Sequence, residues 1–154
     1  MTPEDRGELI CMSPIGTVKN DVNEPRHEGW SEVVSQIVLR SELEEMLDGV
    51  DQFSHLDILF WLDRLPKHHF TKLHPRDRQD LPLVGVLATR TQYRPNPIAV
   101  TTVRLLARQG TTLTVKGLDA LNGTPVLDIK PYVPLYEPSE GVVVAEWVHR
   151  IQPY

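Results

Sequence analysis

The sequence predicts a mainly β fold, and three observations support this prediction. Residues 84–89 alternate in apolar character and residues 98–107 are rich in β-branched side chains, and both patterns are typical of strands. Residues 53–64 have one continuous apolar face and one mixed face, as a stave of a β-barrel would have. No glycine fingerprint of a dinucleotide-binding fold precedes a helix anywhere in the chain. We therefore do not expect a doubly wound α/β sheet.

The N-terminal region is expected to contribute an arm, a strand and a loop. Residues 1–9 are polar and should form a flexible arm. Residues 10–154 are expected to form one domain, which is an ordinary size for a single core. Residues 10–18 predict the first strand, with Cys11 interpreted as a core residue, and residues 20–30 predict a loop.

A second strand and a short helix are predicted next. Residues 31–39 are β-branched enough for a strand. The segment Ser41-Glu-Leu-Glu44 has the pattern of a capping box and predicts a helix of about two turns that ends at Gly49. The side chains expected to face the core from this helix are Leu43, Met46 and Leu47.

Residues 53–64 form the longest clear strand in the sequence. Its core-facing side chains are expected to be Leu56, Ile58, Phe60 and Leu62. The following residues, 65–82, predict a basic loop that contains prolines. Three histidines of this loop do not form a recognisable ligand set with a carboxylate or cysteine, so no metal site is expected at His68, His69 and His74.

The second half of the chain predicts a hairpin and further short elements. Residues 98–107 and 111–116 should pair across a tight turn at Gly110. The remaining expectations are a loop at 117–125, a short strand at 126–130 and a last strand or short helix at 142–148.

Composition and charge limit the classes of function. With 40% hydrophobic residues, no apolar run as long as a membrane span and no basic-then-apolar leader, a cytoplasmic protein without membrane contact is expected. The net charge of −5 has the wrong sign for a protein that holds nucleic acid over its whole surface. Basic residues do gather between Arg64 and Arg78. This cluster indicates either a solvated face or a side toward which a polar substrate is steered.

The centre of the sequence is a polar corner between two apolar runs, here called the elbow (residues 89–97). Pro95 and Pro97 fix their own φ angles and keep the preceding residues out of the helical region, so this corner should be stiff. Its side chains suit the binding of a carboxylate and a planar base, and they are Arg90, Tyr93, Arg94 and Asn96. A proline-rich hairpin with solvated arginines is the alternative.

The elbow segment Ala88-Thr-Arg-(Thr-Gln-Tyr)-Arg-Pro-Asn-Pro-Ile98 strongly resembles the signature of the TsaA-like family. Further motifs of that family follow in the same order over residues 10–134. They are Ile15-Gly-Thr-Val18, Pro25-Arg-His27, Phe53-Ser-His55 and the block from Leu118 to Tyr132. Asn122 stands where the family usually has Asp, so a role that needs a charge at this position is not expected.

The resemblance implies a fold, an activity and partners. Studied members look like tRNA methyltransferases that use S-adenosylmethionine to methylate the N6 position of threonylcarbamoyl-adenosine beside the anticodon. The implied fold is a single-sheeted, closed or partly open β-barrel of about seven strands with one or two short helices. The implied partners are the tRNA anticodon loop and a second copy of the chain in a homodimer, which the mixed face of residues 53–64 could form.

The same resemblance indicates which residues would bind the cofactor S-adenosylmethionine. They are Pro25, Arg26, His27, His55, Asp63, Arg64, Arg90, Val100, Gly117, Leu118 and Asp119. By their chemistry, Arg90 or Arg26 suits the carboxylate of the donor, and Asp119 or Asp63 suits its ribose or ammonium group.

A second set is expected to act on the methyl acceptor: Asp128, Lys130, Tyr132, Tyr93, Arg94 and Asn96. Asp128, or the Tyr132 phenol near Lys130, could accept the proton that the acceptor nitrogen loses. Tyr93 could stack on the base.

Two other functions are compatible with the sequence. The acidic net charge favours a methyltransferase that acts on a small nucleoside-like or amino-acid-like molecule. A non-catalytic module that binds S-adenosylmethionine is the other alternative, although binding alone does not require so many polar groups in the elbow.

Overall fold

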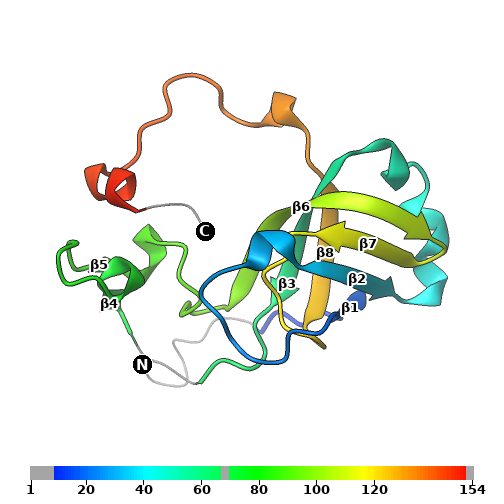
Figure 1. The fold of residues 1–154 in the computed structure, drawn as a ribbon, viewed down its shortest axis with the longest axis horizontal. Coiled ribbons are helices and arrows are strands. Elements are labelled where there is room, and N and C mark those ends of the chain that lie inside the picture. Colours follow the sequence, from blue (N-terminus) through cyan, green and yellow to red (C-terminus); the bar gives the residue numbers. More distant parts are fainter. Residues whose placement is uncertain (1–8, 67–69, 152–154) are drawn as a thin grey trace.

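The computed structural model describes residues 9–66 and 70–151, in which six antiparallel strands close into a barrel (Figure 1). The strand order around the barrel is β1-β2-β7-β6-β3-β8, and β8 pairs with β1 to close it. The barrel strands are β1 (Gly16–Lys19), β2 (Val34–Leu39), β3 (His55–Trp61), β6 (Ile98–Gln109), β7 (Thr112–Lys116) and β8 (Pro125–Pro131). The expected fold class, a mainly β barrel without a Rossmann fold, is confirmed.

The strand β3 shows why this sequence closes around a core. Leu56, Ile58 and Phe60 are at most 1% exposed, and the residues between them face outward. β3 pairs with β6 on one side and with β8 on the other. The inward-facing residues of β3 therefore lie beside the inward-facing residues of β6 and β8. Leu62 packs against this core from just beyond the strand. The two faces predicted for residues 53–64 are therefore correct.

Gly16 allows β1 to approach β2 closely. A Cβ atom on Gly16 would lie 2.6 Å from the carbonyl oxygen of Val38 and 2.8 Å from a side-chain carbon of Leu39. Val18, two residues later, is fully buried in the core. The Ile15-Gly-Thr-Val18 motif thus has a structural role in this barrel: its glycine lets two strands pack closely and its valine fills the core.

Three predictions for the N-terminal region were wrong. The first strand starts at Gly16, and Cys11 is exposed rather than part of the core. Pro14 has no N–H to donate to a strand ladder, and the first hydrogen bond to β8 comes from Ile15. The second strand starts at Val34 because the preceding residues form the 3₁₀ helix η2 (Trp30–Glu32).

The capping-box helix was also predicted incorrectly. The segment is the 3₁₀ helix η3 (Ser41–Leu47), and no side chain caps its N-terminus. In a 3₁₀ helix, residues three apart lie on one line, so Leu43, Met46 and Leu47 cannot form a single stripe. Leu47 is buried, whereas Met46 is 81% exposed.

A small lobe lies beside the barrel (Figure 1). It contains the antiparallel pair β4 (Lys72–Leu73) and β5 (Val84–Gly85). β4 lies within the residues predicted as a loop. The strand predicted at 84–89 was too long, because only Val84 and Gly85 are paired and the next residues form a 3₁₀ helix. An arch of residues 132–145 leads from β8 to the last helix of the lobe. Of the two elements predicted at 142–148, the short helix is present, but it starts at Glu146. The remaining 3₁₀ helices are η4 (Val50–Gln52), η5 (Pro75–Asp77), η6 (Val86–Ala88), η7 (Pro134–Tyr136) and η8 (Glu146–Arg150).

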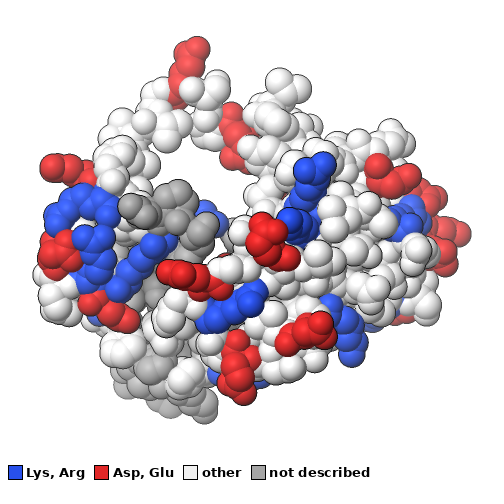
Figure 2. Space-filling view, viewed as in Figure 1, with Lys and Arg blue, Asp and Glu red and all other residues white. Residues whose placement is uncertain are grey.

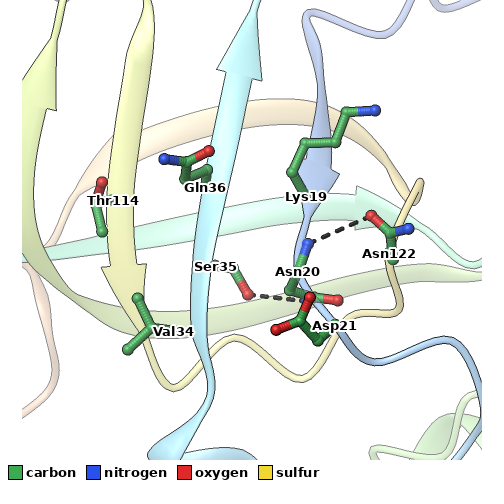
Figure 3. Close-up of a pocket in the computed structure, with 8 residues that line it drawn as sticks. All are labelled: Lys19, Asn20, Asp21, Val34, Ser35, Gln36, Thr114 and Asn122. Atoms are coloured by element: carbon green, nitrogen blue, oxygen red, sulfur yellow. Dashed lines mark hydrogen bonds between the residues drawn. The ribbon is translucent and has the colours of Figure 1, made fainter.

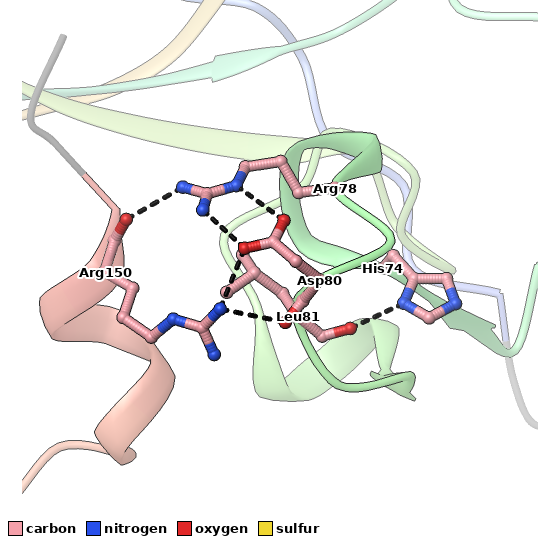
Figure 4. Close-up of polar contacts among 5 residues, drawn as sticks. All are labelled: His74, Arg78, Asp80, Leu81 and Arg150. Atoms are coloured by element: carbon pink, nitrogen blue, oxygen red, sulfur yellow. Dashed lines mark hydrogen bonds and ion pairs between the residues drawn. The ribbon is translucent and has the colours of Figure 1, made fainter.

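An ion-pair network holds η8 on the lobe (Figure 4). The Asp80 carboxylate accepts hydrogen bonds from Arg78 Nη2 at 2.6 Å and from Arg150 Nη2 at 2.8 Å. Arg78 Nη1 also donates to the carbonyl oxygen of Arg150 at 2.8 Å. The hydrogen bond from Arg78 holds the pKa of Asp80 below its ordinary value. One carboxylate therefore joins segments about seventy residues apart.

None of the helices in the described residues is long and apolar enough to cross a membrane. The predicted arm falls outside the described residues except for Leu9, and the single domain at 10–154 stays a prediction.

The tight contact at Gly16 predicts a stability difference between two glycine variants. Gly16→Ala should lower the free energy of unfolding by about 1–3 kcal/mol, because the added methyl group collides with the backbone of β2. Gly85→Ala is the matched control, since its Cβ would have no neighbour closer than 3.9 Å and its φ of −61° is ordinary. Urea unfolding followed by circular dichroism measures both. Equal stability of the two variants would contradict the close approach.

The Asp80 network predicts a pH-dependent attachment of η8. A lowered pKa means that the carboxylate contributes stability above its ordinary pKa and loses it as the pH falls through the folded-state value. Asp80→Asn should reproduce this loss at neutral pH, with faster hydrogen exchange in residues 146–151. Asp77→Asn removes the same charge from the same lobe and should leave that exchange unchanged. Identical protection in wild type and Asp80→Asn would show that other contacts hold the helix.

Candidate functional site

The elbow is fixed at the end of β3 where β6 begins. The Leu62 N–H donates to the Pro97 carbonyl oxygen at 2.9 Å, and the Ile98 N–H donates to the Asn96 carbonyl oxygen at 2.7 Å. Trp61 of β3 pairs with Ile98 of β6, so the elbow enters the barrel at this end. These contacts, together with the two prolines, keep the corner in one position.

Arg94 holds the shape of the elbow. Its Nη1 donates to the carbonyl oxygens of Thr89, at 2.7 Å, and of Thr91, at 3.3 Å. The Thr91 N–H in turn donates to the Thr89 hydroxyl at 3.2 Å. The side chain is half-buried, so its first role is to position the corner. Asn96 is exposed at the other end of the elbow.

Arg90 and Asp119 form hydrogen bonds with two consecutive residues of β6. The exposed Arg90 donates from Nη2 to the Val100 carbonyl oxygen at 3.3 Å. The hydroxyl of Thr101, the next residue, donates to the carboxylate of Asp119. The guanidinium and the carboxylate thus contact neighbouring residues near the start of one strand, although 29 positions separate them in the chain. Sequence reasoning missed Thr101, because it resembles any other β-branched strand residue.

The loop before β2 folds around an arginine and a tryptophan. The Arg26 guanidinium lies 4.7 Å from the centre of the Trp30 ring and donates to the Gly29 carbonyl oxygen at 3.0 Å. The Trp30 indole N–H donates to the Arg26 carbonyl oxygen at 3.0 Å. Pro25 and His27 are exposed beside it. Sequence reasoning did not single out Trp30. The signal that could have done so is an Arg four residues before a Trp.

This loop lies beside the segment that follows β7. The Gly117 N–H donates to the Val33 carbonyl oxygen at 2.9 Å. Lys116 forms an ion pair with Glu32 at 2.8 Å, and this contact lowers the pKa of the Glu32 carboxyl. Leu118 is fully buried in the core, so only its backbone could contact a ligand.

Arg64 connects the end of β3 to the loop before β8. Its Nη2 donates to the Asn122 carbonyl oxygen at 2.6 Å and to the Thr124 hydroxyl at 3.4 Å. It also pairs with Asp63 at 3.5 Å. The Asn122 side chain accepts a hydrogen bond from the Asn20 N–H and donates to Asn23, which is a structural role that needs no charge.

The remaining predicted residues lie on β8 and at the far end of β3. Leu59 of β3 pairs with Asp128 of β8 on one side and with Val100 of β6 on the other. Two strand spacings, about 10 Å, therefore separate Asp128 from Val100. Asp128 forms an ion pair with Lys130 at 2.7 Å, which raises the pKa of that ammonium. The Tyr132 N–H donates to the carbonyl oxygen of His55. Because β3 is about 20 Å long, His55 and Tyr132 are not brought together with the elbow.

Two hollows of the described surface lie away from the elbow. A shallow cavity of about 410 Å³ lies on the outer face of β1, β2 and β7, where Lys19, Gln36 and Thr114 form a row (Figure 3). A smaller one, of about 220 Å³, lies between Pro82 and η8. Neither is lined by a predicted site residue.

Charge is distributed unevenly on this surface. In Figure 2, Lys and Arg side chains gather with acidic ones on the lobe, and an opening separates the lobe and arch from the barrel. Within the described residues, no group of three or more potential metal ligands occurs. His68 and His69 lie outside the described residues.

Comparison with known proteins gives the family. Residues 16–137 match the family described as the tRNA-methyltransferase O N-terminal domain. A protein of Archaeoglobus fulgidus named "Probable S-adenosyl-L-methionine-binding protein" is 37% identical over 94% of this chain and 40% of its own length. A mouse protein named "tRNA (adenine(37)-N6)-methyltransferase" is 33% identical over 71% of this chain and 25% of its own length.

A solved structure agrees with these sequence matches. The crystal structure of TrmO from Pseudomonas aeruginosa superposes with a TM-score of 0.71 and 30% identity, over 90% of this chain and 63% of that one. The chain thus spans less than two thirds of these relatives. The barrel, the elbow and the matched residues together show that the chain belongs to the family of the tRNA-methyltransferase O N-terminal domain.

Proposed function

We propose that this chain binds S-adenosylmethionine at the elbow end of the barrel and methylates N6 of the adenosine that follows the tRNA anticodon. The observation that carries this proposal is that Arg90 and Asp119 contact two consecutive residues of β6, Val100 and Thr101. We call these four residues, with the backbone of Gly117 and Leu118, the donor site.

The residues of the donor site fit the polar groups of the donor. Arg90 is exposed and can form charge-assisted hydrogen bonds with its carboxylate. Asp119 is also exposed and suits its ammonium or ribose hydroxyls. A Cβ on Gly117 would have no neighbour within 4 Å, so there is room for an adenine edge beside its backbone, although its N–H is bonded to Val33. When bound, S-adenosylmethionine supplies an electrophilic methyl group on a sulfonium.

The names of relatives support both parts of the proposal. A protein of Archaeoglobus fulgidus that is 34% identical over 81% of this chain and 91% of its own length is named "S-adenosyl-L-methionine-binding protein". The mouse relative is named for methylation of adenine 37 of tRNA. That the adenosine carries a threonylcarbamoyl group is the finer part of the proposal, and it rests on the resemblance of the motifs.

We favour Asp128 over Tyr132 as the group that accepts the proton lost by the nitrogen of the methyl acceptor. Asp128 lies in the row of Val100, whereas Tyr132 lies with His55 at the other end of β3. Lys130 keeps the carboxylate oriented through their ion pair.

The expected homodimer also stays a proposal. The outer face of β3 and β6 carries Leu59, Trp61, Ile98 and Val100, of which Val100 is 44% exposed. A second copy placed on this apolar face would exclude water from the open donor site, which methyl transfer requires.

A second candidate is a methyltransferase that acts on a small nucleoside-like molecule, which the net charge of −5 favours. RNA binding that weakens steeply with salt supports the tRNA substrate, and a protein that methylates a free nucleoside but binds no RNA supports the second candidate.

The donor site predicts a loss of donor affinity in Arg90→Ala. Titration calorimetry should show binding of S-adenosylmethionine about tenfold weaker or more, because a charge-assisted contact is lost. Arg104→Ala removes the same charge from the middle of β6, opposite His55, and should bind as the wild type does. Equal affinity in both variants would move the carboxylate contact to another residue, with Arg26 the next to test.

The two candidate proton acceptors predict different turnover. Asp128→Asn should lower methylation of tRNA at least about 100-fold, the usual contribution of a general base, while donor affinity persists. Tyr132→Phe should stay within a few-fold of wild type. The reverse ranking would assign the proton to the phenol. Donor binding by wild type with no methylation of any tRNA would indicate a binding module.

A further inference from the structure

The lobe contributes an exposed aromatic ring to the elbow. Phe70 and Tyr93 pack edge to face, with ring centres 5.8 Å apart and an angle of 73° between the planes. Phe70 is 52% exposed, and Tyr93 is half-buried. The pair therefore joins the start of the lobe to the elbow and leaves much of one ring accessible.

The backbone next to Phe70 is fixed, so the ring has a defined place. The Thr71 carbonyl oxygen accepts a hydrogen bond from the Val86 N–H at 3.1 Å. Lys72 pairs with Gly85 in the small sheet, and its side chain is exposed. An aromatic ring held in this way is prepared to stack on a flat partner, since little conformational freedom is lost on contact.

The charged residues near Phe70 and Tyr93 in the chain indicate which flat ligand would stack on the ring. Residues 70–94 contain five Lys and Arg and only two Asp, in a chain whose net charge is −5. The exposed Arg90 lies three residues before Tyr93, and the exposed Lys72 two residues after Phe70. Arg78 and Arg94 donate to groups of the chain itself. An aromatic surface with the exposed cations Lys72 and Arg90 near it in the chain still matches an unpaired nucleobase with its flanking phosphates.

We propose that Phe70, supported by Tyr93, is the platform on which an unpaired base of the RNA substrate stacks. This inference rests on the proposed function, because it assigns the ring to the RNA that the donor site would methylate. Phe70 is a positioning residue: it holds a base of the loop and leaves the donor site to Arg90 and Asp119.

The test uses the full chain and a synthetic tRNA anticodon stem-loop that contains the fluorescent base 2-aminopurine at a loop position. Phe70→Ala should weaken stem-loop binding about tenfold or more and remove the quenching that stacking causes. Phe70→Leu keeps an apolar side chain without a π-face and should behave like Phe70→Ala, whereas Phe70→Trp should restore both affinity and quenching. Phe53→Ala is the matched control, since this phenylalanine is 39% exposed beyond the far end of β3.

Salt dependence and donor affinity complete the test. Phe70→Ala should keep the salt slope of wild type because no charge is lost, whereas Lys72→Ala should reduce that slope by about one. Calorimetry should show unchanged donor affinity in every variant.

The outcomes separate this inference from the proposed function. If wild type and Phe70→Ala bind the stem-loop equally and both methylate tRNA, the platform is wrong and the proposed function stands. If wild type binds the donor but no RNA, the tRNA substrate itself is wrong. If Phe70→Ala instead changes only the oligomeric state, the ring contacts a second copy, which also overturns the platform.

Discussion

The pairing of β3 with β6 on one side and β8 on the other is the constraint on which the site depends. Because side chains alternate along each strand, this register places Leu56, Ile58 and Phe60 in the core and leaves their neighbours outside. A shift by one residue would reverse both faces. The same register sets where β6 begins, and hence where the elbow meets the barrel. The stability of the core thus fixes the geometry of a loop that is not part of it.

The two arginines of the elbow have different roles although the sequence makes them look alike. Arg94 donates to carbonyl oxygens within the elbow, so its charge maintains the local conformation. Arg90 makes one long contact with Val100 and remains exposed, so most of its donors can reach a ligand. Asp119 accepts a hydrogen bond from Thr101, the residue after Val100, so both polar groups lie toward the same end of β6. Removal of Arg94 should therefore affect elbow order as well as binding.

The sequence predicts the parts of this molecule that depend on local patterns. Alternation identifies β3, and β-branched runs around Gly110 identify the hairpin of β6 and β7. The exposure of Cys11 and Met46 was not predictable in this way, because it depends on where β1 starts and on a 3₁₀ rather than an α-helical repeat. The attachment of Arg150 to Asp80 and the contact of Thr101 with Asp119 join distant segments, and no local pattern encodes them.

The internal contacts of the basic residues decide how RNA could be held. The guanidiniums of Arg64, Arg78 and Arg94 donate to groups of the chain itself, which reduces their availability to phosphates. A count of Lys and Arg in the basic segment therefore overstates the electrostatic contribution to binding, and the acidic remainder of the chain opposes it. The proposed RNA binding would then depend on stacking and base-edge contacts more than on charge. The half-exposed ring of Phe70, which packs on Tyr93 of the elbow, would meet this requirement.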